Sequence, residues 1–285
     1  MSSAGAVSHN HDSDLHGLPL PLTGRTSLFA IVGDPIAQVG SPALFNTAFR
    51  HKSWPAVLVP LHVGAADLAQ TLRGLRSIRN LKGLVLTTPH KTASLELVDS
   101  IGLEARLVGS INAVRCGSDG HWHGENFDGI GCVRGLGKAG HAVAGGRVLI
   151  VGTGGAGRAV AATIARQGPA QLILHDLDQA LASSVCGVLQ AAFAEVEVRS
   201  AAPDPRGFDI VINCTPIGMA GSPGIPMDAE RLDPGTVVVD LVVEPETTAL
   251  LRAAAAKGCF VQPGLRTLEG QIDAICAFFE GDGHG

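Results

Sequence analysis

A glycine-rich turn between a predicted strand and a predicted helix is the first segment whose residue types point to chemistry. The apolar run Val148–Val151 ends in Gly152-Thr153-Gly154-Gly155-Ala156-Gly157, and a helical pattern runs from Ala156 to Gln167. Glycine permits the torsions of such a turn, and its missing side chain lets main-chain N–H groups approach a pyrophosphate at a helix N-terminus. The segment therefore predicts the phosphate-binding loop of a dinucleotide site.

The sequence after this turn bears on the choice of cofactor. One G-x-G-x-x-G string is weak evidence in a chain with 37 glycines, but a second strand, Gln171–His175, follows and leads into Asp176. An acidic residue about 20 positions beyond the glycines accepts hydrogen bonds from the adenosine ribose in this type of fold. The Asp176 carboxylate would repel a 2′-phosphate, and residues 175–179 contain no Lys or Arg. We therefore predict NAD rather than NADP as the cofactor. The weaker alternative to a dinucleotide site as a whole is an ordinary tight turn in an α/β sheet.

Two side chains in the first half of the chain could handle a proton. Lys91 follows the predicted strand Gly83–Thr87 and lies in the first turn of a helix predicted to run through Val98, where the positive end of the dipole disfavours an ammonium. A lysine in that position can exchange a proton with a substrate hydroxyl. Asp128 begins a later helix. Taken alone, each has an ordinary interpretation, as a solvated lysine and a helix-capping aspartate.

Other polar residues carry less information by themselves. Asn112 and Gln271 are neutral hydrogen-bonding groups, which are usually structural or solvated. His121 and His123 lie on one face of a short predicted strand, but a third ligand is not evident. We therefore predict a surface hairpin there and no metal site.

Composition limits the classes of protein that need to be considered. The 285 residues suffice for one large or two medium domains, and 46% hydrophobic with 16% charged residues is typical of a globular protein. A net charge of −5 argues against nucleic acid or an anionic membrane as a partner. The apolar runs are strand-sized, so no segment is expected to span a bilayer. Six scattered cysteines without a C-x-x-C pair suggest reduced thiols in a cytosolic protein, and residues 1–26 are predicted to be a disordered tail.

Strands and helices alternate along the chain, which favours an α/β fold with mostly parallel sheets. In the first half, strands are expected at 28–32, 57–61, 83–87, 108–116 and 121–125, with helices at 41–50, where Ser41 would be the N-cap, and at 65–75. In the second half, strands are expected at 148–151, 171–175, 195–199, 209–213, 236–243 and 259–262, and a last helix at 267–280. The Gly-rich helix 127–138 is the expected connection between two domains.

Seven motifs occur together in a characteristic order between Leu28 and Glu280. They are Gly33-Asp-Pro-Ile-Ala-x-x-x-Ser41-Pro, Thr87-Thr-Pro-His-Lys91, Gly109-Ser-Ile-Asn112, Glu125-Asn-Phe-Asp128-Gly, Gly152-x-Gly-Gly-x-Gly157, Asn213-Cys-Thr-Pro-Ile-Gly-Met219 and Gly264-x6-Gln271. In this combination the chain resembles the shikimate dehydrogenase family, which includes quinate/shikimate dehydrogenases.

The resemblance implies an N-terminal α/β substrate-binding domain (27–127 and 266–285) and a C-terminal Rossmann domain (128–265), with the last helix returning to the substrate domain. It also implies a hydride transfer between a ring hydroxyl and a nicotinamide. By position, the matching residues are Lys91 and Asp128 as the catalytic pair; Ser41, Thr87, Asn112 and Gln271 as substrate contacts; Gly152, Thr153, Gly154, Gly155, Ala156 and Gly157 as the pyrophosphate loop; Asp176 at the ribose; and Leu241 and Gly264 near the nicotinamide.

Three positions depart from the family pattern. Val39 and Val243 stand where the family usually has a serine and a tyrosine near the substrate carboxylate, and Val85 stands where it has an asparagine. Each hydrogen bond to a charged group contributes roughly 1.5 to 3 kcal/mol, so weak binding of shikimate is expected.

These departures leave three interpretations open. The leading one is a cytosolic NAD-dependent enzyme, a monomer or homodimer, that acts on shikimate, quinate or a similar cyclic polyol acid. The second keeps the fold and changes the cyclic polyol, with weak activity on shikimate. The third is a non-catalytic sensor of NAD or a metabolite, which would have no need for both Lys91 and Asp128.

Overall fold

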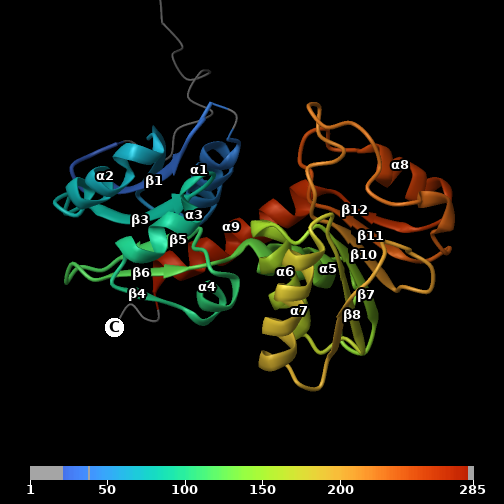
Figure 1. Ribbon diagram of the computed structural model, residues 1–285. Coiled ribbons are helices and arrows are strands. Elements are labelled where there is room, and N and C mark those ends of the chain that lie inside the picture. Colours follow the sequence, from blue (N-terminus) through green and yellow to red (C-terminus); the bar gives the residue numbers. More distant parts are fainter. Residues whose placement is uncertain (1–21, 38, 282–285) are drawn as a thin grey trace, which may run out of the picture.

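The computed structural model describes residues 22–37 and 39–281, and this part of the chain forms two six-stranded sheets with helices between and around them (Figure 1). The first sheet has the strand order β2-β1-β3-β5-β6-β4, and the second has the order β12-β11-β10-β7-β8-β9. Each sheet has hydrophobic clusters of its own on its faces. The predicted α/β class is therefore confirmed.

The first sheet is mixed. Strands β1 (Ser27–Gly33), β2 (Ala56–His62) and β3 (Leu81–Leu86) are parallel, whereas β5 (Ala113–Cys116) runs antiparallel to β3 and to β6 (Trp122–Glu125), and β4 (Ser100–Ile101) lies at the edge beside β6. Its connections contain helices α1 (Ser41–His51), α2 (Leu68–Leu75), α3 (His90–Ala93) and α4 (Leu103–Val108), and the short 3-10 turns η1 (Ala65–Asp67) and η2 (Ser94–Leu97). The loops after β1 and β3 lie at the same end of the sheet.

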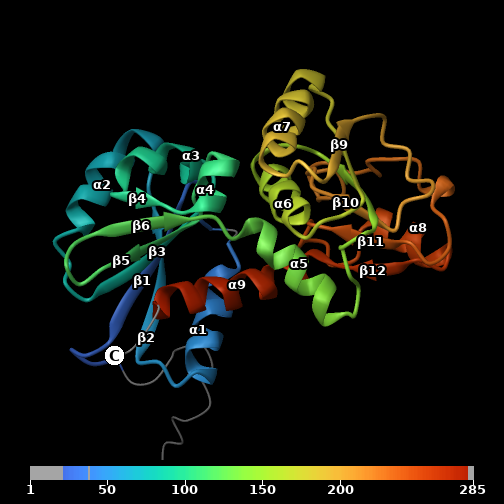
Figure 2. The same ribbon diagram turned by 90° about the horizontal axis from the view of Figure 1, so that it is seen from below.

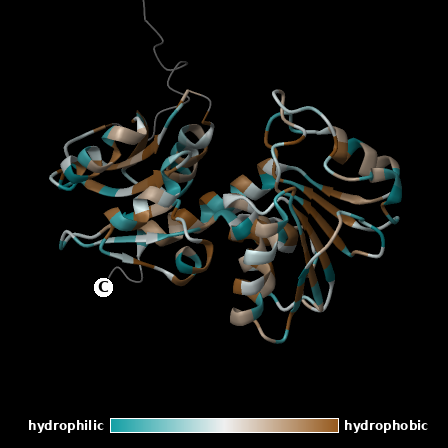
Figure 3. Ribbon diagram, viewed as in Figure 1, coloured by the Kyte–Doolittle hydropathy of each residue, from teal (hydrophilic) through white to brown (hydrophobic). Residues whose placement is uncertain are grey.

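The second sheet is parallel throughout. Its strands are β7 (Arg147–Val151), β8 (Gln171–His175), β9 (Glu197–Ser200), β10 (Ile210–Asn213), β11 (Val237–Asp240) and β12 (Phe260–Gln262), and its connections contain α6 (Gly155–Arg166), α7 (Gln179–Ala192), η3 (Ala229–Arg231) and α8 (Ala249–Ala256). The four inner strands, β11, β10, β7 and β8, are strongly hydrophobic (Figure 3), as expected where helices cover both faces. The strand order reverses between β7 and β10, and such a point forms a ligand crevice at the carboxyl ends of the strands.

Helices α5 (Asp128–Lys138) and α9 (Gly264–Glu280) lie against each other between the two sheets (Figure 2). Glycine makes the close approach possible: a Cβ on Gly131 would overlap the Thr267 carbonyl oxygen, and a Cβ on Gly270 would press on the Gly131 backbone. The far half of α9 packs into the core of the first sheet through Ile275 and Phe279. The last helix therefore returns to the first sheet, as the resemblance implied.

Several predicted elements were wrong in extent or kind. The strand expected over 108–116 covers only β5, because Gly109, with a φ of 70°, ends α4, a helix that was not predicted. The helix expected through Val98 stops at Ala93 and continues as η2, and the helix expected over 65–75 begins as η1. Ser41 is the first residue of α1 rather than its cap, since Gly40 occupies the N-cap position.

Residues 1–21 of the predicted tail lie outside the described residues. The part that is described, residues 22–26, contains a turn in which the Thr26 amide donates to the Thr23 carbonyl at 3.1 Å. Among the helices in the described ranges, none combines the length and the apolar character needed to cross a bilayer.

Candidate active site

Lys91 and Asp128 form an ion pair, although 37 positions separate them in the sequence. The Lys91 Nζ lies 2.7 Å from Asp128 Oδ2, with 29% of the lysine side chain and 10% of the aspartate side chain exposed. Lys91 belongs to α3, directly after β3, and Asp128 is the first residue of α5. The largely buried carboxylate of Asp128 therefore fixes the position of the Lys91 ammonium. The dipole of α3 contributes less, because this helix has only four residues.

Two amides hold the same carboxylate from its other side. Asn112 Nδ2 donates to Asp128 Oδ1 at 2.8 Å, and Gln271 Nε2 donates to that oxygen at 2.6 Å. Together with Lys91, three donors from three separate segments fix the orientation of Asp128. Gln271 reaches the cluster because α9 packs on α5. The structure thus brings four of the six predicted catalytic and substrate-contact residues together.

A further layer of hydrogen bonds supports this cluster. Asn112 Oδ1 accepts from the Phe127 amide at 2.9 Å, and Asn126 Oδ1 accepts from the Asp128 amide at 3.0 Å. On the lysine side, the buried His90 ring donates Nε2–H to the Val63 carbonyl at 2.7 Å, which anchors α3. The sequence interpretation gave no role to Asn126 or His90. For Asn126 the signal was present, because an asparagine two residues before a helix often bonds to the backbone there.

Ser41 and Thr87 are the two predicted contacts outside the cluster. Thr87 is half-buried beside the loop after β1, so close that a Cβ on Gly33 would overlap its methyl group. Ser41 is half-buried at the start of α1. Within the described ranges, neither hydroxyl forms a hydrogen bond to Lys91 or Asp128.

The three valines at the departing positions differ in exposure. Val85 is 7% exposed and belongs to the core of the first sheet, Val39 packs against that core from the loop before α1, and Val243 is 41% exposed. Val85 therefore offers neither a polar group nor room for a solvated charge.

The glycine turn between β7 and α6 has the shape that a phosphate loop needs. Gly152 has a φ of 97°, and a Cβ on Gly157 would overlap the Gly152 carbonyl oxygen, so both glycines are required by the turn itself. By contrast, a Cβ on Gly154 or Gly155 would meet no atom within 4 Å. The space above these two residues, at the N-terminus of α6, is open. The loop therefore fits a dinucleotide pyrophosphate.

Asp176 is anchored to this loop. Its Oδ2 accepts from the Thr153 amide at 2.6 Å and from the Thr153 hydroxyl at 2.9 Å, while Oδ1 accepts from the Asp178 amide at 3.0 Å. Burial raises the pKa of Asp176, but the hydrogen bonds from Thr153 and Asp178 outweigh it and hold the pKa below its usual range. A cavity of about 320 Å³ lies beside the carboxylate, lined by Gly152, Gly154, Asp176, Leu177, Thr215 and Ile217.

Gly264 lies at the predicted nicotinamide end of the cofactor site. It is the first residue of α9 and packs against the segment that follows β11. A Cβ on Gly264 would overlap the carbonyl oxygens of Leu241 and Val242. The two residues predicted near the nicotinamide, Leu241 and Gly264, are therefore in contact with each other.

Comparison with known proteins decides the family. Residues 31–114 match the model of the shikimate dehydrogenase substrate binding domain. A shikimate dehydrogenase (NADP(+)) of Geobacter metallireducens is 33% identical over 92% of this chain and 94% of its own length. The chain belongs to the shikimate dehydrogenase family.

Solved structures of similar proteins span several substrates. Shikimate 5-dehydrogenase from Listeria monocytogenes, in complex with shikimate and NAD, superposes with a TM-score of 0.85 at 27% identity over 92% of this chain and 94% of that chain. The 5-ketofructose reductase of Gluconobacter sp. strain CHM43 gives 0.84 at 30% identity, covering 91% and 95%. Quinate dehydrogenase from Corynebacterium glutamicum, in complex with NAD, gives 0.80 at 30%, covering 90% and 95%. Two of these structures contain NAD, whereas the Geobacter metallireducens relative is named for NADP(+), so the comparisons support a nicotinamide cofactor without choosing between NAD and NADP.

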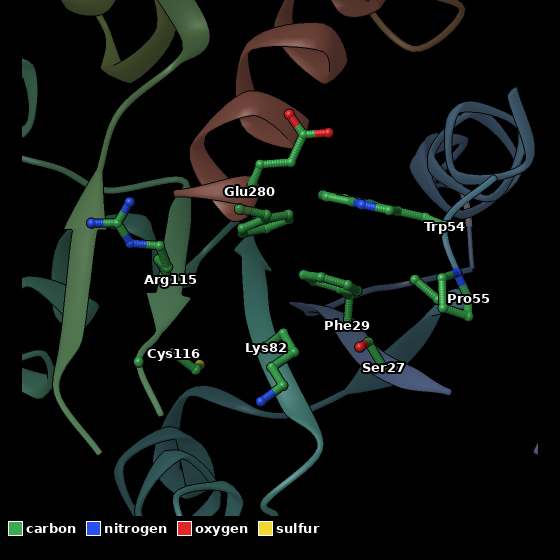
Figure 4. A pocket seen from close by; sticks show the side chains of 11 residues that line it. Ser27, Phe29, Trp54, Pro55, Lys82, Arg115, Cys116 and Glu280 are labelled. Atoms are coloured by element: carbon green, nitrogen blue, oxygen red, sulfur yellow. The ribbon is translucent and has the colours of Figure 1, made fainter. Parts of the chain in front are cut away.

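A second cavity, of about 350 Å³, lies away from the Lys91–Asp128 cluster of this shikimate dehydrogenase family member (Figure 4). Ser27, the first residue of β1, and Lys82, near the start of β3, line it, so it opens at the opposite end of these strands from Lys91. Two of the three charged residues that line it have partners, since Glu280 pairs with Lys52 at 3.0 Å and the Arg115 guanidinium stacks on the Phe278 ring at 5.1 Å. Figure 4 shows the Arg115 and Lys82 head groups directed away from the aromatic rings.

His121 and His123, the two histidines of the predicted hairpin, both contact the hydroxyl of Ser100. His121 Nε2 and His123 Nδ1 each lie 2.8 Å from the Ser100 hydroxyl, and burial lowers the pKa of His123. In the part of the chain that the structure describes, no group of three or more His, Cys, Asp or Glu side chains could hold a metal ion.

Proposed function

We propose that this protein is an NAD-dependent oxidoreductase that transfers a hydride between a ring hydroxyl of a cyclic polyol acid, such as shikimate or quinate, and the nicotinamide. Residues 27–127 with 266–285 would bind the substrate, and residues 128–265 the dinucleotide. The observation that carries the proposal is the Lys91–Asp128 pair at 2.7 Å, held by amides from two further segments. A sensor would not need that arrangement, so catalysis is the better interpretation.

In the proposed mechanism Lys91 moves the proton. When the alcohol is oxidised, its hydroxyl proton must leave together with the hydride, and Lys91 Nζ accepts it as the neutral amine and becomes the ammonium; in the reverse direction the ammonium returns the proton. Asp128 bonds to the same hydroxyl and keeps the lysine oriented, while Asn112 and Gln271 keep Asp128 in place. Ser41 and Thr87 contribute hydroxyl contacts to the substrate. NAD, when bound, supplies the hydride acceptor.

The cofactor assignment is argued from the pocket beside the glycine turn. Gly152, Thr153, Gly154, Gly155, Ala156 and Gly157 would hold the pyrophosphate, Asp176 the ribose, and Leu241 and Gly264 the nicotinamide end. The Asp176 carboxylate favours an unmodified ribose, because its pKa lies below the usual range and it therefore stays charged. A 2′-phosphate would have to approach that charge with no Lys or Arg among the residues that line the cavity.

A second candidate substrate is a cyclic polyol that carries no carboxylate. The specific observation is that Val39, Val85 and Val243 are apolar where the family usually has polar contacts. Val39 and Val243 would leave a substrate carboxylate without these two polar contacts, and a structural neighbour of this chain is named for 5-ketofructose rather than shikimate. This candidate keeps Lys91, Asp128 and the cofactor site unchanged.

The test of the proposal is a steady-state screen of NAD and NADP reduction with shikimate, quinate and uncharged cyclic polyols. We expect turnover with at least one ring alcohol, and a kcat/KM at least tenfold higher with NAD than with NADP. A preference for NADP would contradict the role given to Asp176. Turnover of uncharged polyols alone would select the second candidate, and no turnover of any ring alcohol would refute the proposal.

The valines give a prediction that separates the two candidates. Changing Val39→Ser and Val243→Tyr together should raise kcat/KM for shikimate by tenfold or more, because each new hydrogen bond to a carboxylate contributes roughly 1.5 to 3 kcal/mol. The measurement is kcat/KM for shikimate and for an uncharged polyol. Val188→Ser, on an exposed position of α7, is the matched control and should change neither value. No gain for shikimate would show that these positions do not define the carboxylate end.

A further inference from the structure

A buried pair of polar side chains joins two neighbouring strands of the second sheet. Asn213 ends β10 and Asp240 ends β11, and the two residues are directly opposite in the parallel register. Both are 0% exposed, and Asn213 Nδ2 donates to Asp240 Oδ1 at 2.9 Å. Buried polar groups at the carboxyl ends of strands in this type of sheet lie next to its ligand crevice.

Asn213 holds the loop that forms one wall of the cavity beside Asp176. Its Oδ1 accepts from the Thr215 amide at 2.9 Å and from the Thr215 hydroxyl at 2.7 Å, while its Nδ2 also donates to the Ile217 carbonyl at 3.0 Å. Thr215 and Ile217 line the cavity, and Thr215 also packs on Gly152. One side chain thus sets the shape of this loop.

Asp240 holds the chain on the other side. Its Oδ1 also accepts from the Val242 amide at 3.1 Å, and its Oδ2 accepts from the hydroxyl of Thr248, the N-cap of α8, at 2.6 Å. Gly264 packs against the carbonyl oxygens of Leu241 and Val242. Asp240 therefore fixes the backbone at the end where Leu241 and Gly264 meet.

We infer that Asn213 and Asp240 are positioning residues for the dinucleotide: their mutual hydrogen bond locks the loop at 214–217 and the loop at 241–243 at the spacing that the cofactor requires. This inference rests on the cofactor site proposed above. Neither side chain reaches the cofactor, because both are fully buried. A purely structural role would affect folding stability without a specific effect on NAD affinity, and that difference makes the inference testable.

The experiment measures NAD affinity and stability in the full chain. Asp240→Ala and Asn213→Ala should each raise the Kd for NAD, measured by titration calorimetry, by tenfold or more, and the KM for NAD should rise while the KM for the polyol stays within twofold. The double variant should raise the Kd by less than the product of the two single effects, because both changes break the same hydrogen bond between Asn213 and Asp240.

Asp240→Asn is the conservative rescue. An amide at this position can still accept from Asn213 and Val242 through its oxygen and donate to Thr248 through its nitrogen. We expect its Kd for NAD to remain within threefold of wild type. If Asp240→Ala does not fold, Thr248→Val, which removes the donor to Asp240 Oδ2 and the acceptor of the Leu251 amide, should still raise the Kd by threefold or more.

Thr236→Val is the matched control for stability. Thr236 is also buried and its hydroxyl donates to the Phe208 carbonyl at 3.0 Å, but it lies before β11, at the end of the sheet away from the cofactor. Urea unfolding should show a loss of stability with an unchanged Kd. Equal effects of Asp240→Ala and Thr236→Val on Kd would overturn the inference. Absence of NAD binding by the wild type would instead refute the proposed function, and the inference with it.

Discussion

Lys91→Ala is expected to lower kcat for the ring alcohol by about a thousandfold or more, because proton transfer by a positioned side chain contributes on the order of 10² to 10⁴ in rate and the ammonium also orients the substrate. The Kd for NAD should stay within twofold of wild type, since Lys91 lies beside the first sheet and the glycine turn in the second. Steady-state kinetics and calorimetry measure the two quantities separately. A variant that keeps a tenth of the wild-type kcat would contradict the assigned role.

Chemical rescue makes this result specific to the proton. The alanine leaves a space beside Asp128, which still accepts from Asn112 and Gln271 and therefore remains oriented. Added ethylamine should restore part of the turnover of Lys91→Ala, and it should not restore that of Asp128→Ala. Lys138→Ala is the matched control: it breaks an ion pair of 3.0 Å with Asp273 between α5 and α9, on side chains that are 66% and 53% exposed. Its kcat should equal that of wild type. Loss of both turnover and NAD binding in Lys91→Ala would indicate misfolding.

Local sequence patterns predicted the second sheet more accurately than the first. The strand Gln171–His175 was predicted with the bounds that β8 has, and the glycine turn was placed between the correct strand and helix. Both depend on interactions between near neighbours. Helix α4 was missed because the carboxylate at its N-terminus comes from Glu125, which accepts from the Ala105 amide at 2.7 Å from 20 positions away. A local reading cannot detect a cap from so distant a residue.

The cluster around Lys91 and Asp128 shows the same limit for the candidate site. Nothing in the residues around Lys91 or Asp128 distinguishes a catalytic pair from a solvated lysine and a cap, and only the resemblance joined them. The structure explains why: the pair forms across the loop after β3 and the start of α5, and Gln271 reaches Asp128 from 143 positions away. Asp240 was missed for a different reason, because a lone aspartate at a strand end gives no signal until its buried partner Asn213 is known.

Gly155→Ala is expected to affect stability and cofactor affinity in opposite directions. A Cβ at this position would meet no protein atom within 4 Å, and alanine favours a helix over glycine by up to roughly 1 kcal/mol, so the free energy of unfolding should be unchanged or slightly higher. The same Cβ would project from the first residue of α6 into the space proposed for the pyrophosphate. Hydrogen bonds to a charged group contribute roughly 1.5 to 3 kcal/mol each, so losing two of them should weaken NAD binding about a hundredfold or more.

The matched control is Gly187→Ala, a helical position in α7 that is also free of protein atoms within 4 Å and lies outside the cofactor cavity. It should give the same or a larger gain in urea unfolding with no change in the Kd for NAD. If Gly155→Ala binds NAD as tightly as wild type, the pyrophosphate does not lie over the start of α6. The cofactor would then have to be placed elsewhere, even with Lys91 and Asp128 in their proposed roles.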